Sequence, residues 1–284
     1  MTTNLGFSSE QDLNTLLELF VELVQSQAGQ EVRDGEAWLN DRQTLATKLY
    51  RHLHSMRQLG TGSVLLFRGQ GSSFIDHSSV KVLARASLET YLVFYYIFGK
   101  NDLEESRFRH TSWVLGGLMD RQNFVATTSA SQRVRAVEWK QVLSLREKLQ
   151  SHRSFHFFTK KQQGKLLDGE WKTGKAWDDL AINAGFHPIY FRNIYSFLCG
   201  YSHSSYASAL QVGQATEIES QRMLSGSMFG VACMLAAHFA VTYASMFERA
   251  QNTLEANPLS KKIAARWQFG ADDMNAVYGK SIAD

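Results

Sequence analysis

The segment SVKVLARASLETYLVFYYIF, residues 79–98, decides the fold of this chain. Apolar side chains occur on nearly every side of a helix drawn through it, and Gly99 follows its last residue. A helix that is apolar nearly all round is buried among other elements rather than lying on a surface. The segment therefore predicts a central helix, which the rest of the chain must cover.

The rest of the chain supplies further helical patterns. Its 284 residues contain only two prolines, Pro188 and Pro258, and this favours long helices because proline breaks a helix interior. Apolar residues recur at helical spacing in six more segments. The additional predicted helices cover residues 8–28, 36–59, 103–125 and 134–151, a helix that opens at Pro188, and residues 217–251.

Two segments lack this pattern. Residues 60–77 are rich in glycine and serine and predict a loop, and residues 152–185 are polar and predict a surface excursion. The fold prediction is therefore all-α, a single helical bundle of about seven to nine helices. One helical domain is expected over residues 1–284, with its core at about 78–250, N-terminal helices at 8–60 and a C-terminal tail at 252–284.

Charge and cysteine content favour a soluble protein of the cytoplasm. The net charge is +3, and no run of five or six Lys or Arg marks a nucleic-acid or membrane patch. An RNA partner is compatible with this balance but is not indicated by it. Cys199 and Cys233 lie in apolar helical surroundings, which suits free thiols in a reducing compartment. The first residues show no secretory signal, so we expect a cytoplasmic location.

Residues 227–247 form an apolar segment as long as a bilayer-spanning helix. His238 lies at its centre and small polar residues are scattered through it, which weakens membrane insertion. Glycine and alanine at close spacing suit tight packing inside a bundle. We expect this helix in the protein core, and a membrane-acting effector is the weaker alternative.

Several kinds of active site are not supported. The chain has neither a phosphate-binding Gly-x4-Gly-Lys-Ser/Thr loop nor a Gly-x-Ser-x-Gly nucleophile elbow. None of its nine histidines has an acidic residue three positions before it, so the Glu-x-x-His signature of di-iron bundles is missing. We expect neither a metal nor another cofactor.

HEPN ribonucleases provide another helical class to test. Their signature is an arginine followed four to six residues later by a histidine, and Arg146 and His152 fit it. Chance alone gives roughly one or two such matches in a chain with this many arginines and histidines. The helix also ends at this point, so the motif carries little weight.

The segment YFRNIYSFLCGYSHSS, residues 190–205, holds the densest group of polar and aromatic side chains. If a helix runs through Gly200, one face carries Arg192, Tyr195 or Ser196, Cys199, His203 and Tyr206. We take Tyr195, Ser196, Ser202 and Tyr206 as candidate binding residues.

The central helix adds Arg85 and Glu89, one helical turn apart on an otherwise apolar segment. Two interpretations remain open. In the first, Arg85 and Glu89 form an ion pair, joined by a tyrosine hydroxyl, that fixes helix packing. In the second, Glu89 orients His203 as an acid or base, which makes His203, Arg192, Arg85 and Glu89 candidate catalytic residues. Either way Arg85, Glu89 and His203 are expected in one interior cluster, where losing Glu89 costs more than about 2 kcal/mol.

The segments VKVLARASLETYLVFYYIF and YSFLCGYSHSS together resemble a bacterial family of all-helical proteins of unknown function. That family shows an Arg-x3-Glu helix and a Tyr-Ser…His motif, and the matching positions here are Arg85, Glu89, Tyr195, Ser196 and His203. Cys199 stands where the family usually has serine. The resemblance covers roughly residues 78–247. The family is remotely similar to HEPN and abortive-infection helical domains, which implies a stress or phage-defence context.

The predicted function is an interaction or effector module that acts through a protein partner or as a homo-oligomer. The alternative is a metal-independent, HEPN-like ribonuclease that uses His203 with Arg192 or Arg85. Cleavage of RNA without metal, lost in a folded His203→Ala variant, separates the two.

Overall fold

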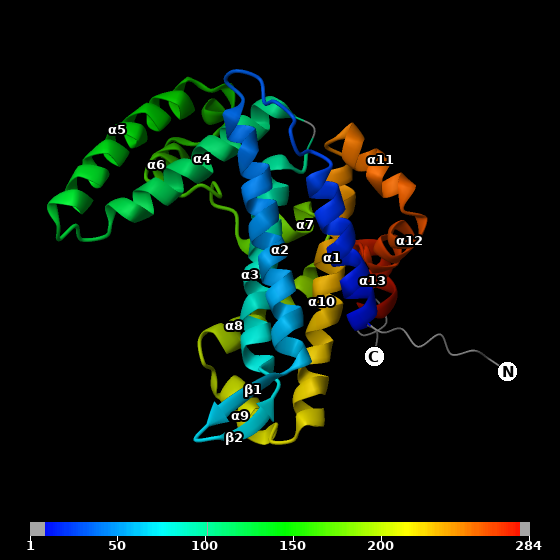
Figure 1. Cartoon of the computed structure of the whole chain (residues 1–284). Coiled ribbons are helices and arrows are strands. Elements are labelled where there is room, and N and C mark those ends of the chain that lie inside the picture. Colours follow the sequence, from blue (N-terminus) through cyan, green and yellow to red (C-terminus); the bar gives the residue numbers. More distant parts are fainter. Residues whose placement is uncertain (1–8, 101, 279–284) are drawn as a thin grey trace. The chain divides into compact units, whose positions relative to one another are not determined.

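The computed structural model describes residues 9–100 and 102–278. Over these residues the protein is helical apart from one short hairpin, so the all-α prediction is confirmed. Figure 1 shows the long helices α1, α2, α3 and α10 and the hairpin strands β1 (Ser63–Phe67) and β2 (Gln70–Phe74). The α-helices are α1 (Ser9–Gln25), α2 (Asp41–Thr61), α3 (His77–Phe98), α4 (Leu103–Gln122), α5 (Ser129–Ser151), α6 (Lys160–Leu167), α7 (Trp177–Asn183), α8 (Pro188–Ser202), α9 (Tyr206–Gln214), α10 (Ile218–Ala244), α11 (Glu248–Ala256), α12 (Pro258–Trp267) and α13 (Ala271–Tyr278).

Thirteen α-helices are present in the described residues, so the predicted number of seven to nine is wrong. The additional helices are short. They lie where the sequence predicts a surface excursion (α6, α7), within residues 203–217 (α9) and in the tail (α12, α13), and the predicted helix 217–251 is divided between α10 and α11. Helices of seven to ten residues complete only two or three turns, so a 3.6-residue apolar pattern barely repeats in them.

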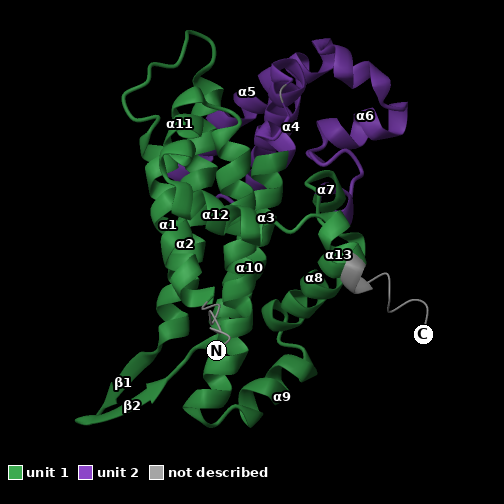
Figure 2. Ribbon diagram, turned by 90° about the vertical axis from the view of Figure 1, so that its right-hand side faces the viewer, with its two compact units in different colours: residues 1–95, 181–284 green, residues 96–180 purple. Residues whose placement is uncertain are grey.

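The described chain divides into two compact units, coloured separately in Figure 2. The first unit comprises residues 1–95 and 181–284, and the second comprises residues 96–180. The first contains α1, α2, the hairpin, most of α3 and the helices from α8 onward. The organisation of the chain as one domain stays a prediction.

Aromatic contacts between α1, α3 and α10 form the core of the first unit. Phe20 of α1 stacks on Phe239 of α10 with ring centroids 3.8 Å apart, and Phe94 of α3 lies 5.1 Å from Phe239. The hydroxyls of Tyr91 and Thr242 are 3.3 Å apart, so the buried tyrosine keeps a polar partner. The segment 79–98 is therefore central, because α3 is itself largely buried and packs its aromatic residues directly against α10.

That helix, α10, includes the apolar segment of bilayer length. In the described residues it is the one helix long and apolar enough to span a membrane, and 72 % of the residues in its most apolar window are buried in the protein. His238 Nε2 lies 2.9 Å from the carbonyl oxygen of Phe269, and burial lowers the pKa of this histidine. An apolar helix that is largely covered by its own chain is typical of a protein core.

The ends of the site-bearing helices follow from their capping residues. Pro188 opens α8 as predicted, and His187 Nδ1 accepts from two backbone amides of its first turn. Asp76 caps the start of α3, because its carboxylate accepts from the backbone amide of Ser79 at 2.9 Å.

The second unit has a small core of its own. It is built from α4, α5, α6 and the 3₁₀ turn Arg153–Phe157. Its buried apolar residues are Phe108, Leu115, Val142, Leu149, Phe155 and Leu166. The predicted surface excursion at 152–185 therefore supplies part of this core through Phe155 and Leu166.

The Gly/Ser-rich segment forms an antiparallel hairpin rather than a loop. Arg68 and Gly69 turn the chain with φ angles of 49° and 80°, the two positive values of a type I′ turn. The usual sequence signal for this turn is Asn-Gly or Asp-Gly, and Arg-Gly does not give it. The sequence of this segment therefore predicts a loop instead of a hairpin.

Gly60 allows α2 to approach α10, and this close contact generates a stability prediction. A Cβ at Gly60 would lie 2.5 Å from Cζ of Phe229 and 2.7 Å from Oγ of Ser225. We expect Gly60→Ala to lower the free energy of unfolding by about 1–3 kcal/mol, because the buried ring must move. Gly226 of α10 has open space at its Cβ position. Gly226→Ala should therefore raise stability by roughly 0.5–1 kcal/mol. Urea unfolding measures the free energy of unfolding of both variants. Equal changes in the two variants would contradict the close contact at Gly60.

Candidate functional site

A polar stripe runs along the otherwise apolar helix α3. His77, Lys81, Arg85 and Glu89 follow one another at intervals of four residues, which places them on one side of the helix. Helix α8 supplies their partners in the opposite chain order, since Tyr201 contacts Lys81 while Tyr195 contacts Glu89. The candidate site is therefore the seam between α3 and α8.

At the outer end of the seam, three side chains form a fixed group. Arg85 Nε donates to a carboxylate oxygen of Glu89 at 3.0 Å, and the Tyr195 hydroxyl donates to the same oxygen at 2.7 Å. The Arg85 guanidinium lies over the Tyr195 ring, 5.5 Å from its centroid. Partial burial and the bond to Glu89 raise the pKa of Tyr195. Tyr195 therefore stays a proton donor that helps to hold Glu89 against Arg85.

His203 completes this group from the end of α8. Its Nε2 lies 3.3 Å from a terminal nitrogen of Arg85. The helix ends at Ser202, and Ser204 then takes a φ of 52°, which turns the chain away and leaves His203 at the helix terminus. Gly200 permits this ending, because a Cβ there would lie 2.9 Å from Ser205 Oγ.

The proton arrangement of His203 follows from its partner. A guanidinium group only donates hydrogen bonds, so Nε2 of His203 must be unprotonated to accept one. The hydrogen-bonded state is then a neutral imidazole with its proton on Nδ1. An exposed neutral imidazole beside a fixed cation is able to take a proton from a ligand while the cation attracts the ligand's negative charge.

The structure changes two parts of the sequence hypothesis. Glu89 does not contact His203 directly but is joined to Arg85 and Tyr195, and Arg85 is the residue that touches the imidazole. The cluster is also not in the interior, because the Arg85 and Glu89 side chains are 22 % and 27 % exposed and His203 is exposed. The ion pair bridged by a tyrosine hydroxyl is present, and its outer edge reaches solvent.

The remaining candidate residues lie outside this group. Arg192 and Ser196 are exposed on α8, with Arg192 about 16 Å of helical rise from His203. The Ser202 hydroxyl donates to the carbonyl of Leu198 within the same helix. Tyr206 begins α9 with 82 % of its surface exposed. Because α8 stops at Ser202, the single face predicted through Tyr206 does not form.

Cys199 lies on α8 one turn before His203 and is partly exposed. It is close enough to Arg85 for the two groups to interact electrostatically. The second cysteine, Cys233, is buried in α10 and its thiol donates to the backbone oxygen of Ser9 at 3.2 Å. Burial raises the pKa of the Cys233 thiol.

The inner end of the seam holds a pair that the sequence analysis missed. Lys81 is fully buried, and its Nζ lies 3.2 Å from Nδ1 of His77 and 4.6 Å from the ring centroid of Tyr201. Burial lowers the Lys81 pKa to about 8. Burial and the neighbouring Lys81 charge lower the His77 pKa, against the opposing influence of Asp76. His77 therefore serves as a neutral acceptor for the lysine amine.

The aromatic residues of α8 enclose Lys81. Its Nζ lies 6.0 Å from the ring centroid of Phe197, on the same helix as Tyr201. The Tyr201 hydroxyl donates to the side-chain oxygen of Gln211 in α9. The four-residue spacing of His77 and Lys81 indicates that the two side chains are neighbours on one side of α3. Their burial, however, depends on how α8 and α9 pack.

The arginine and histidine that fit the HEPN spacing have separate structural partners. Arg146 Nε donates to the carbonyl of Leu167 at 2.9 Å. His152 Nδ1 accepts from the backbone amide of Ser154 at 3.1 Å, and its Nε2 lies 3.7 Å from a Glu104 oxygen. Both side chains hold the second unit together, so this motif does not assemble a catalytic pair.

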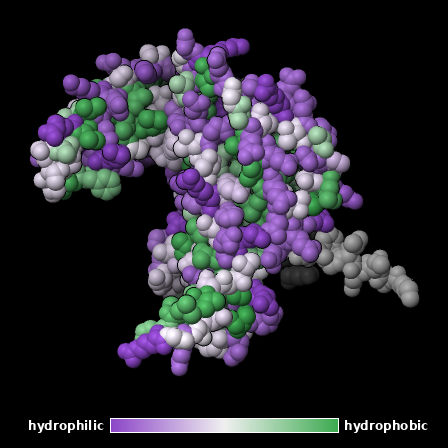
Figure 3. All heavy atoms as spheres, in the orientation of Figure 1, coloured by the Kyte–Doolittle hydropathy of each residue, from purple (hydrophilic) through white to green (hydrophobic). Residues whose placement is uncertain are grey.

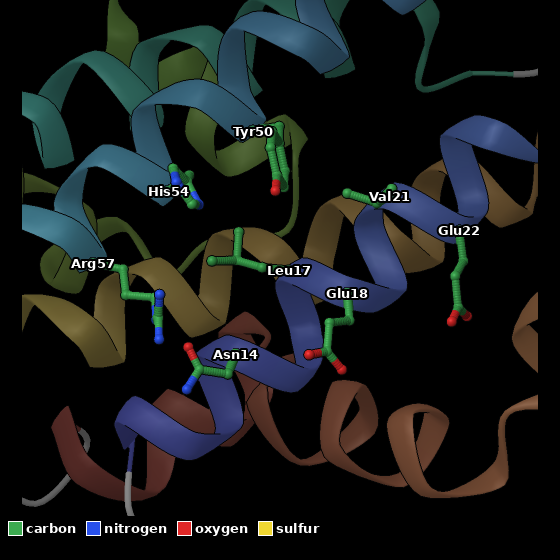
Figure 4. A pocket seen from close by; sticks show the side chains of 8 residues that line it. All are labelled: Asn14, Leu17, Glu18, Val21, Glu22, Tyr50, His54 and Arg57. Atoms are coloured by element: carbon green, nitrogen blue, oxygen red, sulfur yellow. The ribbon is translucent and has the colours of Figure 1, made fainter.

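A groove of about 470 Å³ lies between α1 and α2, away from the seam (Figure 4). Glu18 and Glu22 line it from α1, whereas His54 and Arg57 line it from α2. Acidic and basic groups therefore face the same space, and its charge selects no one class of ligand. In the described residues, no group of three or more His, Cys, Asp or Glu side chains is placed to hold a metal ion.

Fold and site together define an all-α protein with a partly exposed Arg–Glu–Tyr–His cluster between two helices. The chain belongs to the family of unknown function DUF5677, whose match covers residues 49–220, more than half of the chain. This span contains both α3 and α8. No curated protein and no solved structure matches the chain.

The buried Lys81 gives a pH-dependent stability prediction. A pKa near 8 in the folded chain, against about 10.5 in the unfolded chain, corresponds to roughly 3 kcal/mol. Between these values the unfolded chain holds a proton that the folded chain has released, so wild-type stability rises as the pH increases from about 8. Lys81→Met removes the titrating group. We expect it to be more stable than wild type at pH 7, by up to about 3 kcal/mol, with a smaller margin at pH 9.5.

Urea unfolding at both pH values measures this margin. Lys261→Met is the matched control, because Lys261 is half exposed on α12. If the stability difference between Lys81→Met and wild type is the same at pH 7 and 9.5, the pKa of Lys81 is not lowered in the folded chain.

The Glu89–Tyr195 hydrogen bond generates a coupling prediction. Because Glu89 is partly exposed, we expect Glu89→Ala to cost about 1 kcal/mol rather than the more than 2 expected for an interior cluster. Tyr195→Phe should cost a similar amount, and the double variant less than their sum, because both remove the same bond. Glu219→Ala breaks the exposed pair with Arg222 and should change stability by less than about 0.5 kcal/mol. Additive effects of the Glu89 and Tyr195 changes would contradict the shared bond.

Proposed function

We propose that this chain is an effector module that binds a phosphate-bearing partner, single-stranded RNA, through Arg85 and His203. The observation that carries the proposal is the 3.3 Å contact between the exposed imidazole and the guanidinium. Glu89 and Tyr195 fix the guanidinium from below, through Nε and through the ring face. A preorganised guanidinium suits a phosphate, because its donors match two phosphate oxygens.

The charge of the site supports an anionic ligand. Glu89 neutralises part of the Arg85 charge, but its bonded oxygen also accepts from Tyr195. The Arg85 nitrogen that faces His203 lies on the solvent side of the cluster, where a phosphate can replace the imidazole as its acceptor. The mildly basic chain, with a net charge of +3, assists the approach of a polyanion without dominating it.

Metal-independent cleavage of the bound RNA is the second candidate function. It is favoured by the position of His203 Nε2 at the exposed edge of the cluster, 3.3 Å from Arg85, because an imidazole nitrogen without a proton serves as a general base. The ribose 2′ oxygen bonds to phosphorus while its proton passes to Nε2, and the bond to the 5′ oxygen breaks. The departing oxygen takes a proton from water, which leaves a 2′,3′-cyclic phosphate. Arg85 stabilises the negative charge that develops on the phosphate oxygens.

The wider context is part of the same proposal. A defence or stress role rests on the resemblance to HEPN and abortive-infection domains, and it goes with a cytoplasmic location and a bacterial source. Protein partners and self-association remain available to an effector of this kind. A membrane-acting effector is the least supported alternative, because most of α10 is covered by the chain itself.

RNA binding is measured by fluorescence polarisation with a labelled single-stranded RNA in the presence of EDTA. We expect Arg85→Gln to weaken binding about tenfold or more, since a hydrogen bond to a charged group contributes roughly 1.5–3 kcal/mol. Arg222→Gln is the matched control, because it removes the same charge from an exposed pair on α10. Equal losses of RNA affinity in the two variants would contradict the proposal, as would a wild type that does not bind RNA at low salt.

Cleavage is tested separately with the same RNA. If His203 is the base, wild type yields products with cyclic phosphate ends in EDTA. His203→Ala keeps the RNA contact of Arg85 but releases no such product. Circular dichroism confirms that the variant is folded. Binding without cleavage leaves the effector proposal in place and removes the enzymatic candidate.

A further inference from the structure

The β1–β2 hairpin exposes an unusual amount of apolar surface. Four consecutive residues of β1 have more than half of their surface exposed: Val64, Leu65, Leu66 and Phe67. Figure 3 shows hydrophobic surface gathered at the end of the first unit that carries this hairpin. Contiguous apolar surface of this kind marks an interaction site in a soluble protein.

The pairing register gives one face of the hairpin a distinctive shape. Leu66 pairs with Gly71 and Val64 pairs with Ser73, so these four residues share one face. The two large side chains, 74 % and 66 % exposed, stand beside two of the smallest residues. Projections and hollows therefore alternate on the same small surface.

Such a surface is complementary to itself. In a twofold-symmetric interface the same patch occurs on both subunits, so it must carry each projection together with the hollow that receives it. A second hairpin can face the first across a twofold axis that runs parallel to the strands, between the two faces. This axis sets Leu66 of each copy over Gly71 of the other, and Val64 over Ser73. A flat apolar partner, such as a lipid surface, would gain nothing from the hollows.

The hairpin also lacks the features that protect isolated strands. Neither strand has a third partner in the described part of the chain, and the segment from Ser63 to Phe74 contains no proline and no lysine. A lone two-stranded hairpin is only marginally stable in water, whereas a second layer supports it. Its one charged residue, Arg68, lies in the turn and not in either paired strand.

We propose that the hairpin face formed by Val64, Leu66, Gly71 and Ser73 is a homodimer interface that packs against the same face of a second copy. Unlike RNA binding, this association uses no residue of the α3–α8 seam. Val64 and Leu66 are the two large apolar side chains on this face, and alone they provide much less than the roughly 800 Å² per copy typical of stable complexes. Exposed apolar residues of α9 and the start of α10 extend this end of the first unit: Tyr206, Leu210, Val212, Ile218 and Met223. The expected dimer is therefore of micromolar strength.

Two substitutions with opposite effects on hydrophobicity test the interface in the full chain. Leu66→Lys removes a projection and adds a charge, and Gly71→Val fills a hollow. Gly71 does not have a positive φ, and a Cβ there meets Leu66 Cδ2 at 3.6 Å and Val64 Cγ1 at 3.7 Å, which are ordinary contacts. Valine also favours strands, so the variant keeps its hairpin. Val125→Lys, at an 84 % exposed site in the second unit, is the control.

Sedimentation velocity over a micromolar concentration series gives the dissociation constant of each protein. We expect a wild-type dimer whose dissociation constant rises at least tenfold in both Leu66→Lys and Gly71→Val, and is unchanged in Val125→Lys. A wild type that stays monomeric at all concentrations overturns the proposal. So does a dimer that Gly71→Val leaves intact or strengthens, because the hollow then has no role.

Vesicle co-sedimentation distinguishes a lipid occupant. Wild-type binding to phosphatidylcholine–phosphatidylglycerol vesicles that is lost in Leu66→Lys and increased in Gly71→Val would assign the face to a membrane surface and overturn the dimer. Absence of vesicle binding, together with the concentration-dependent dimer, supports the second copy.

Discussion

The structure depends on a conflict within α3. This helix must be buried, because its residues are apolar on almost every side. One side, however, carries the polar residues His77, Lys81, Arg85 and Glu89. Ionisable groups in such a position need partners, since removing them from water without hydrogen bonds costs several kcal/mol. Helix α8 provides these partners through Tyr195, Tyr201 and His203. When α8 packs on this side of α3, it gives the polar residues hydrogen-bonding and aromatic partners. The same packing brings His203 into contact with Arg85.

The two ends of the stripe differ in chemistry because they differ in access to water. At the buried end, an amine lies against a neutral imidazole and an aromatic ring, and its charge is disfavoured. At the open end, a guanidinium keeps its charge with the help of a carboxylate and shares its outer donors with an exposed imidazole. The same residue spacing thus yields a structural pair at one end and a ligand-facing group at the other.

Sequence patterns predicted the parts of the fold that repeat over many turns. The central position of α3, the long helices α1, α2 and α10, and the opening of α8 at Pro188 all follow from periodicity and capping. The partnership of Arg85 with Glu89 follows from their spacing. The position of His203 does not, because it depends on the backbone turn at Ser204 that ends α8 and points the imidazole at Arg85 rather than Glu89.

The burial of Lys81 does not follow from the sequence either, because it depends on aromatic residues of α8 that are distant in the sequence from residues 77–89. The short helices and the hairpin were missed for a local reason. Helices such as α7 are too brief to show a period, and the turn formed by Arg68 and Gly69 lacks the Asn or Asp that usually marks it.

The two cysteines give the site a chemical label of its own. Nucleophilic reaction requires a thiolate that reagents can reach. Cys233 meets neither requirement. It is buried, so reagents do not reach it, and its hydrogen-bonded thiol has a raised pKa, so it stays protonated. Alkylation of the native chain therefore concentrates on Cys199, one turn from His203 and beside Arg85. A fluorophore attached there reports on occupancy of the cluster in an otherwise unaltered sequence.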